Sequence, residues 1–143
     1  MNGYFAIKIF LRVSLAASFL SAVADRLGLW SKEVSAWGNW EAFLNYTAVI
    51  NPWMPAGLIP ALGFVASAAE VLFGVCLLAG FKTELVARLS GALLLLFAIS
   101  MTLATGIKGP LDYSVFTAAA GAFALSTLTS KYLEVDVYFS GKR

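Results

Sequence analysis

The chain has 143 residues, of which 60% are hydrophobic and only 13% are charged. Soluble domains carry about 25% charged residues, so this composition excludes an ordinary soluble domain and indicates a single membrane domain over residues 1–143. The net charge of +2 is too small to indicate a nucleic-acid partner, and the partner we expect is the lipid bilayer.

The sequence contains no histidine and a single cysteine, Cys76. Bis-His haem, His-ligated copper and ordinary zinc sites therefore lack their ligands, and an intramolecular disulfide or a CxxC pair is impossible. We expect no metal site, and no cofactor bound covalently or through His or Cys ligands. If the protein handles electrons, the carrier is a bound small molecule or belongs to a partner.

Four apolar stretches are long enough to span a bilayer, which takes about 20 residues. They cover residues 4–24, 57–81, 85–107 and 111–130. The connections between the last three are tight, and short connections make consecutive helices antiparallel neighbours. The predicted fold is an all-α membrane protein, an antiparallel four-transmembrane-helix bundle.

The first stretch ends at Ala22-Val23-Ala24, which resembles a signal-peptidase site. Lys8 and Arg12 lie too deep in the stretch for the usual charged start of a signal peptide. We therefore expect this helix to be retained.

The connection over residues 25–56 carries all four tryptophans, which prefer the membrane–water boundary. Five residues within it recur at the spacing of one helix face, namely Ala36, Trp40, Phe43, Thr47 and Ile50. Asn51-Pro52 ends the pattern. We predict an amphipathic helix at 34–50, in the first extracytoplasmic loop, lying over the outer end of the bundle.

The orientation follows from the even number of spans, which places both termini on one side of the membrane with the turn at Lys82. Most basic residues close to the apolar stretches lie on that side: Lys8, Lys82, Arg88, Lys131, Lys142 and Arg143. Because basic residues favour the cytoplasm, we predict cytoplasmic termini. We assign Lys8, Glu84 and Arg88 to topology and to snorkelling towards the headgroups.

Glu70 is the only charged residue in the stretch 57–81. An ionisable group at membrane depth is costly and usually faces a protein interior with a partner. Arg12 lies at a similar depth on the first helix, and a guanidinium suits a carboxylate, so we predict an intramembrane Arg12–Glu70 pair. Two roles remain open: a structural pair that fixes helix register, or a functional group that anchors a ligand or handles protons.

Polar and aromatic residues at the outer boundary form a second candidate site. Asp25, Arg26, Lys108 and Asp112 are expected to meet there, either as an interface network or as a polar gate for a headgroup or anion. The candidate residues of this outer entrance are Asp25, Arg26, Trp40, Trp53, Asp112 and Tyr113.

The second apolar stretch resembles the DoxX family of small four-helix membrane proteins. The matching run starts at Glu70-Val-Leu-Phe-Gly74 and continues as an aliphatic segment to a glycine turn, Gly80-Phe-Lys-Thr83. The first helix is also similar, with Arg12-Val-Ser-Leu15 followed by a polar end at Asp25-Arg26. The long tryptophan-rich segment departs from the shorter members of the family.

The resemblance implies a role linked to quinones in a bacterial inner membrane. Relatives are linked to quinone-coupled redox complexes, including thiosulfate:quinone oxidoreductase and a terminal quinol oxidase, and to oxidative-stress and sulfur-handling assemblies. We therefore expect a subunit of a quinone-linked redox complex; if it is an enzyme, it is an oxidoreductase subunit that acts with a quinone. Its protein partners would be redox subunits or further copies of the same chain.

Two alternatives stay open. One is a non-catalytic assembly, scaffold or stress protein built on the same bundle. The other is a small-solute carrier, against which stands the lack of an inverted repeat and of a pair of broken helices in the sequence.

If a quinone binds, we expect it in the outer half of the bundle, with Glu70 below it and Trp40, Trp53 and Asp112 above it. A flat ligand of this kind needs an apolar cavity with one or two polar groups. The tryptophans supply flat walls only at the outer end.

Overall fold

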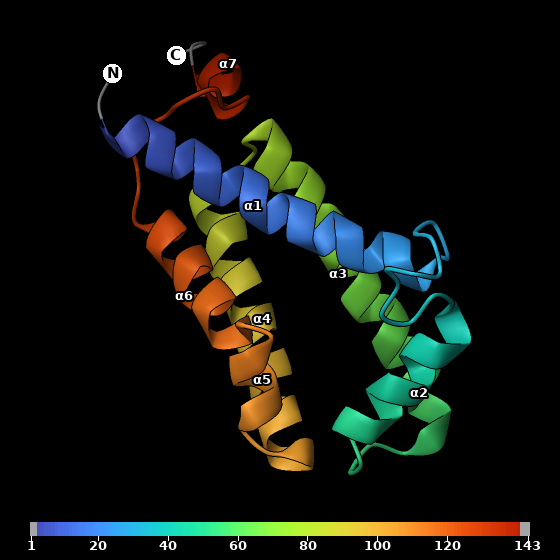
Figure 1. The fold of residues 1–143 in the computed structure, drawn as a ribbon. Helices are drawn as coiled ribbons and strands as arrows, with labels where there is room; N and C mark the ends of the chain where they lie inside the picture. Colours follow the sequence, from blue (N-terminus) through green and yellow to red (C-terminus); the bar gives the residue numbers. More distant parts are fainter. Residues whose placement is uncertain (1–2, 141–143) are drawn as a thin grey trace.

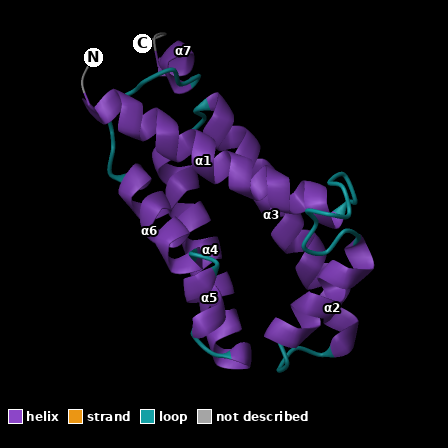
Figure 2. Ribbon diagram, in the orientation of Figure 1, coloured by secondary structure: helices purple, strands orange, loops and turns teal. Residues whose placement is uncertain are grey.

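The computed structural model describes residues 3–140, and the side chains of residues 3–138. Lys142 and Arg143, which contribute to the predicted basic side, lie outside the described residues. Within the described range the chain is helical, and its longest connecting loop covers residues 27–39, between α1 and α2 (Figure 2).

Among residues 3–140, three helices are long and apolar enough to cross a membrane, which indicates a membrane protein. They are α1 (Gly3–Arg26), α3 (Ile59–Ala79), which continues from the short 3-10 helix η1 (Ala56–Leu58), and α4 (Thr83–Thr105). These helices correspond to the first three predicted stretches.

The helices form two closely packed pairs, α1 with α3 and α4 with α6 (Val115–Ser126). The start of α1, the α3–α4 turn and the short helix α7 (Asp136–Ser140) lie at one end of the molecule (Figure 1). We call this the inner end, and the opposite end, which carries α2 and α5, the outer end. One apolar core joins all four long segments: Leu15, Ala16, Phe19, Leu77, Val86, Ala87, Ala122 and Leu125.

The predicted fourth span is interrupted. A one-turn helix, α5 (Lys108–Asp112), ends before Ser114, which adopts a left-handed conformation with φ of +56°. The following helix, α6, has 12 residues and is about 18 Å long, which is short for a bilayer. The prediction of one continuous helix over 111–130 is therefore wrong. Asp112 and Ser114 have side chains that compete for backbone hydrogen bonds and disfavour helix interiors.

The outer helix is shorter than the sequence pattern predicts. α2 covers Trp40–Ile50 instead of 34–50. Gly38 has a positive φ of +73°, and the side chain of Asn39 caps the helix by accepting a hydrogen bond from the Ala42 N–H at 2.8 Å. The face of α2 that is buried consists of Phe43, Thr47 and Ile50.

Two glycines on α3 permit close approach of its neighbours. A Cβ at Gly74 would lie 2.9 Å from the side chain of Leu20 on α1, and one at Gly63 would lie 2.6 Å from the side chain of Leu44 on α2. An added Cβ at either position would require the neighbouring leucine side chain to shift, so both glycines favour the close packing of α1 and α2 against α3.

Candidate functional site

The partner of Glu70 is Arg26. Arg26 Nη1 donates hydrogen bonds to Glu70 Oε2 at 2.5 Å and to Ser67 Oγ at 2.7 Å. Both charged side chains are only 4% exposed. Ser67 in turn donates to the carbonyl of Gly63 at 2.8 Å, so the network holds the outer end of α1 against α3.

The antiparallel register of α1 and α3 explains why Arg12 does not reach Glu70. Arg12 bonds to Leu77, whereas Arg26 bonds to Glu70. Leu77 follows Glu70 by seven residues, about 10 Å along the helix. The predicted Arg12–Glu70 pair is therefore not formed. At the inner end α1 extends past the end of α3, so Arg12 lies beside the end of α3 instead of beside Glu70. The part of α1 that extends further contacts the chain after α6, through Lys8.

Aromatic rings cover the Arg26 guanidinium from the outer side. Its Cζ lies 3.9 Å from the ring centroid of Phe43 and 5.3 Å from that of Trp37. Phe43 also contacts Trp40, with ring centroids 5.3 Å apart. A desolvated cation over an aromatic face gains about 2 kcal/mol.

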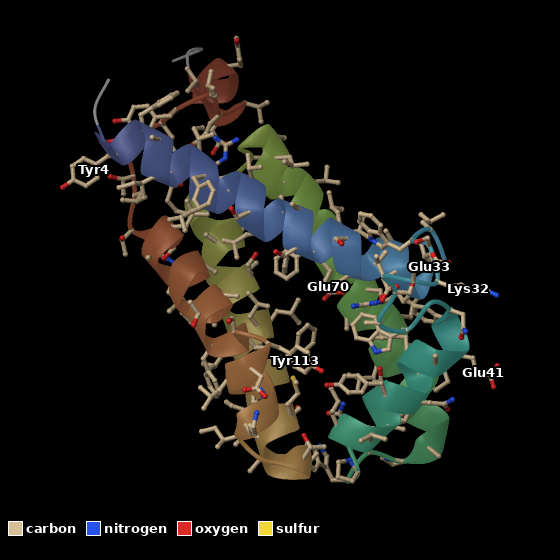
Figure 3. All side chains as sticks on the ribbon, in the orientation of Figure 1. Tyr4, Lys32, Glu33, Glu41, Glu70 and Tyr113 are labelled. Carbon is tan, nitrogen blue, oxygen red and sulfur yellow. The ribbon has the colours of Figure 1, made fainter. Side chains whose placement is uncertain are left out.

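One donor of this buried guanidinium remains without an acceptor. Among the described residues, Arg26 Nε has no hydrogen-bond partner. Figure 3 shows Glu70 on α3, in the part of the helix that α1 crosses. The site thus combines a neutralised ion pair, an N–H that is not engaged, and aromatic walls.

Three outer candidates lie away from this network. Asp112 pairs with Lys108 within α5, and both side chains are exposed. Trp53 is 54% exposed and Tyr113 is 76% exposed, and Figure 3 shows Tyr113 projecting from the end of α5. The predicted meeting of α5 charges with the end of α1 is not among the described contacts.

Asp25 also turns away from the Arg26–Glu70 pair. Its Oδ2 accepts hydrogen bonds from the N–H groups of Ala36 at 2.9 Å and Trp37 at 3.0 Å. Asp25 therefore shapes the loop between α1 and α2, and this loop places Trp37 over Arg26.

Arg12 is bonded to the main chain at the inner end. Its Nε and Nη2 donate to the carbonyls of Leu77 and Leu78 at 2.9 and 3.0 Å. Its Nη1 donates to the carbonyls of Tyr132 and Leu133 at 2.7 and 3.1 Å. The last carbonyls of a helix lack internal partners and carry partial negative charge, so Arg12 caps α3 and holds the segment that follows α6.

Lys8 and Lys131 complete the inner end through ion pairs. Lys8 Nζ donates to the Ser130 carbonyl at 2.8 Å and lies 2.6 Å from Glu134 Oε1, with both charged side chains fully buried. The assignment of Lys8 to snorkelling is therefore wrong. Lys131 is exposed, and the slight desolvation of its ammonium group opposes its charge, but hydrogen bonds to Glu84 and the attraction of Glu134 outweigh this and raise the pKa of Lys131.

Ser67 and Trp37 contact the central arginine but do not stand out in the sequence. Ser67 precedes Glu70 by three residues, a spacing that puts both on one helix face, so the sequence does contain a signal for it. Trp37 has no such signal, because its position depends on the turn at Gly38.

No family model, no curated protein and no solved structure matches the chain. The resemblance to the DoxX family therefore remains a prediction from the residues.

Proposed function

We propose that the chain is a DoxX-like subunit of a quinone-linked redox complex, a four-helix protein of a bacterial inner membrane with cytoplasmic termini. In this proposal a quinone binds at the outer half of the bundle beside Arg26. The observation that carries it is the buried Arg26 guanidinium, whose Nε has no acceptor among the described residues and which lies under aromatic rings.

The chemistry of the residues fits a neutral, flat ligand with carbonyl oxygens. Glu70 neutralises Arg26 at 2.5 Å, so a ligand without charge suits the site. The Nε hydrogen of Arg26 would donate to one carbonyl oxygen, and the rings of Phe43 and Trp37 would pack against the quinone ring. A bound quinone supplies the electron carrier that the side chains of this protein lack.

The proposed site includes Glu70 and Trp40, as the sequence predicts for a quinone site, but it does not include Trp53 and Asp112. Trp53 is exposed, and Asp112 is paired with Lys108 on the surface. The electrons would enter or leave through partner subunits, because the sequence has no histidine and only one cysteine.

Quinone content of the purified protein tests this proposal. The protein is reconstituted with ubiquinone or menaquinone, washed, extracted and analysed by chromatography. Arg26→Lys is the sharpest variant, because it keeps a cation for Glu70 but removes the Nε donor. Phe43→Leu removes the aromatic wall, and Arg88→Lys, an exposed arginine at the inner end, is the matched control.

We expect Arg26→Lys and Phe43→Leu to lose most of the bound quinone while Arg88→Lys retains it. Helix content by circular dichroism shows whether the variants are folded. If folded Arg26→Lys and Phe43→Leu retain as much quinone as the wild type, or the wild type retains none, the proposal fails.

A scaffold or assembly protein is the second candidate. The observation in its favour is that Arg26 Nη1 joins α1 to both Glu70 and Ser67 of α3, as a structural network would. In that case partner proteins would co-purify equally with the wild type and with Arg26→Lys, and neither would contain quinone.

A further inference from the structure

A shallow depression of about 410 Å³ lies at the outer end, between α1 and the loop that follows it. The residues that define its chemistry are Ser18, Ser21, Asp25, Trp30 and Trp37. It is separate in chemistry from the Arg26–Glu70 site, because no Lys or Arg lines it.

Asp25 brings a buried negative charge to this depression. The residue is 6% exposed. Its Oδ2 accepts hydrogen bonds from two backbone N–H groups, and the Ser35 hydroxyl and the Gly38 N–H also lie close enough to favour the charged carboxylate. Its Oδ1 is buried, and no donor within residues 3–140 reaches it with ordinary hydrogen-bond geometry. The described ion pairs also leave Asp25 without a cation, although a buried charge is costly unless it is paired.

The neighbouring Arg26 does not compensate Asp25. Its guanidinium is turned to α3, where it bonds to Glu70 and Ser67. The Arg26–Glu70 pair is neutral overall, so the carboxylate of Asp25 sets the charge at the depression.

Trp30 supplies a fixed aromatic ring beside the carboxylate. Its Nε1 donates to the carbonyl and to the hydroxyl of Ser21, at 3.2 and 3.1 Å. The ring is nevertheless 49% exposed, so its surface is available to a ligand. Aromatic faces together with a carboxylate are the arrangement that recognises organic ammonium groups.

We propose that this depression binds the ammonium group of an organic cation, with Asp25 as counter-ion and the rings of Trp30 and Trp37 as walls. Two sources carry this chemistry at the membrane surface: the headgroup of a zwitterionic lipid, and a soluble amine such as choline. Tryptophan is enriched at the depth of lipid headgroups, which suits either source. The proposal goes beyond the quinone site and requires neither quinone nor the Arg26–Glu70 pair.

The test uses the full-length protein in a maltoside detergent, which has no ammonium group. In the first arm, native mass spectrometry counts retained phosphatidylcholine, phosphatidylethanolamine or phosphatidylglycerol, the last of which has no ammonium group. In the second arm, choline chloride is titrated while tryptophan fluorescence is followed.

Three variants make the test specific. Asp25→Asn removes the charge but keeps an oxygen that accepts the N–H groups of Ala36 and Trp37. Trp30→Leu removes the ring and leaves the hydrogen bonds of Asp25 to Ala36 and Trp37 intact. It therefore decides the outcome if Asp25→Asn fails to fold. Glu33→Gln removes an exposed carboxylate of the same loop, labelled in Figure 3, and controls for general attraction of cations.

We expect ammonium lipids to be retained over phosphatidylglycerol, and Asp25→Asn and Trp30→Leu to lower binding by about tenfold or more, as truncation of a buried charge pair does. Glu33→Gln should bind as the wild type does. If the protein retains ammonium lipids but its tryptophan fluorescence does not respond to choline, the ligand is a lipid headgroup. If choline changes the fluorescence of the wild type but not of Asp25→Asn, the ligand is a soluble amine. Four results would overturn the proposal. The protein could retain phosphatidylglycerol as well as the ammonium lipids, or bind nothing in either arm. Asp25→Asn and Trp30→Leu could both bind as the wild type does, or Glu33→Gln could lose as much binding as they do.

Discussion

The two buried arginines of α1 compensate their charge in different ways. Arg26 meets a carboxylate and a hydroxyl on α3, whereas Arg12 meets four main-chain carbonyls. Both arrangements satisfy a cation that would be costly alone in an apolar interior. Arg26 therefore depends on the identity of one side chain, and Arg12 depends on the path of the backbone.

This difference predicts strong coupling between Arg26 and Glu70. Arg26→Leu or Glu70→Leu alone should lower the free energy of unfolding by about 3–5 kcal/mol, because each leaves an unpaired buried charge. The double variant should lose less than the sum. Denaturant titrations of the four proteins in detergent give the coupling energy.

Arg12→Leu combined with Glu70→Leu is the matched control for that cycle. These residues do not contact each other, so their losses should add. Coupling between Arg12 and Glu70, or additivity between Arg26 and Glu70, would contradict the observed pairing.

Gly80 provides a second test at the level of one residue. It ends α3 with φ of +70°, and a Cβ there would lie 2.6 Å from Arg12 Nη2 and from the Cα of Glu134. Gly80→Ala should destabilise the protein by at least about 1–3 kcal/mol, the usual cost of a strained backbone position. Gly57→Ala, where a Cβ meets nothing within 4 Å, should change the melting temperature little, and a similar small change for Gly80→Ala would speak against the close contact.

The sequence identifies the residues of the site better than it identifies their partners. Glu70 stands out because a charge in an apolar stretch needs a partner, but both arginines of α1 are candidates. The choice between them depends on how far α1 extends past α3, which is set by contacts at residues 130–134 that no helical periodicity reveals. The rings over Arg26 depend likewise on the loop that Asp25 organises.

At the level of elements, the length of an unbroken apolar stretch predicts reliably that a long helix forms, but the sequence does not predict the exact residues at which a helix begins and ends. The stretches 4–24, 57–81 and 85–107 become α1, α3 and α4 with small shifts of their ends. The start of α2 and the interruption at Ser114 depend instead on backbone conformation at single residues. A pattern of burial alone does not determine either feature.

The N-cap of α2 can be tested directly. Asn39→Ala should cost about 0.5–2 kcal/mol, because it removes the side-chain bond to the Ala42 N–H, whereas Asn39→Asp should retain the cap. Thermal unfolding measures both. Asn45→Ala, at an exposed position within α2, is the control, and an equal effect of the two alanine variants would show that the cap contributes nothing specific.

At the level of the whole molecule, the two ends differ in character. The inner end carries ion pairs among Lys8, Lys131, Glu84 and Glu134 and an open, charged depression beside Lys82 and Arg88, whereas the outer end carries the aromatic rings of both candidate sites.

The orientation in the membrane is a separate prediction. The bias of basic residues places the inner end in the cytoplasm, so reporter fusions at Lys82 and after Arg143 should both report a cytoplasmic location, and one in the loop near Glu33 should report the opposite side. An extracytoplasmic signal at Lys82 or Arg143 would reverse or abolish this topology.

The contacts of Arg12 also order the biogenesis of the protein. Two of its four acceptor carbonyls belong to residues that the ribosome adds about 120 positions later, after α1, α3 and α4 have been synthesised. Until then the nascent protein holds this arginine with only the end of α3 to satisfy it. The four hydrogen bonds of Arg12 can therefore be completed only after the segment that follows α6 has left the ribosome.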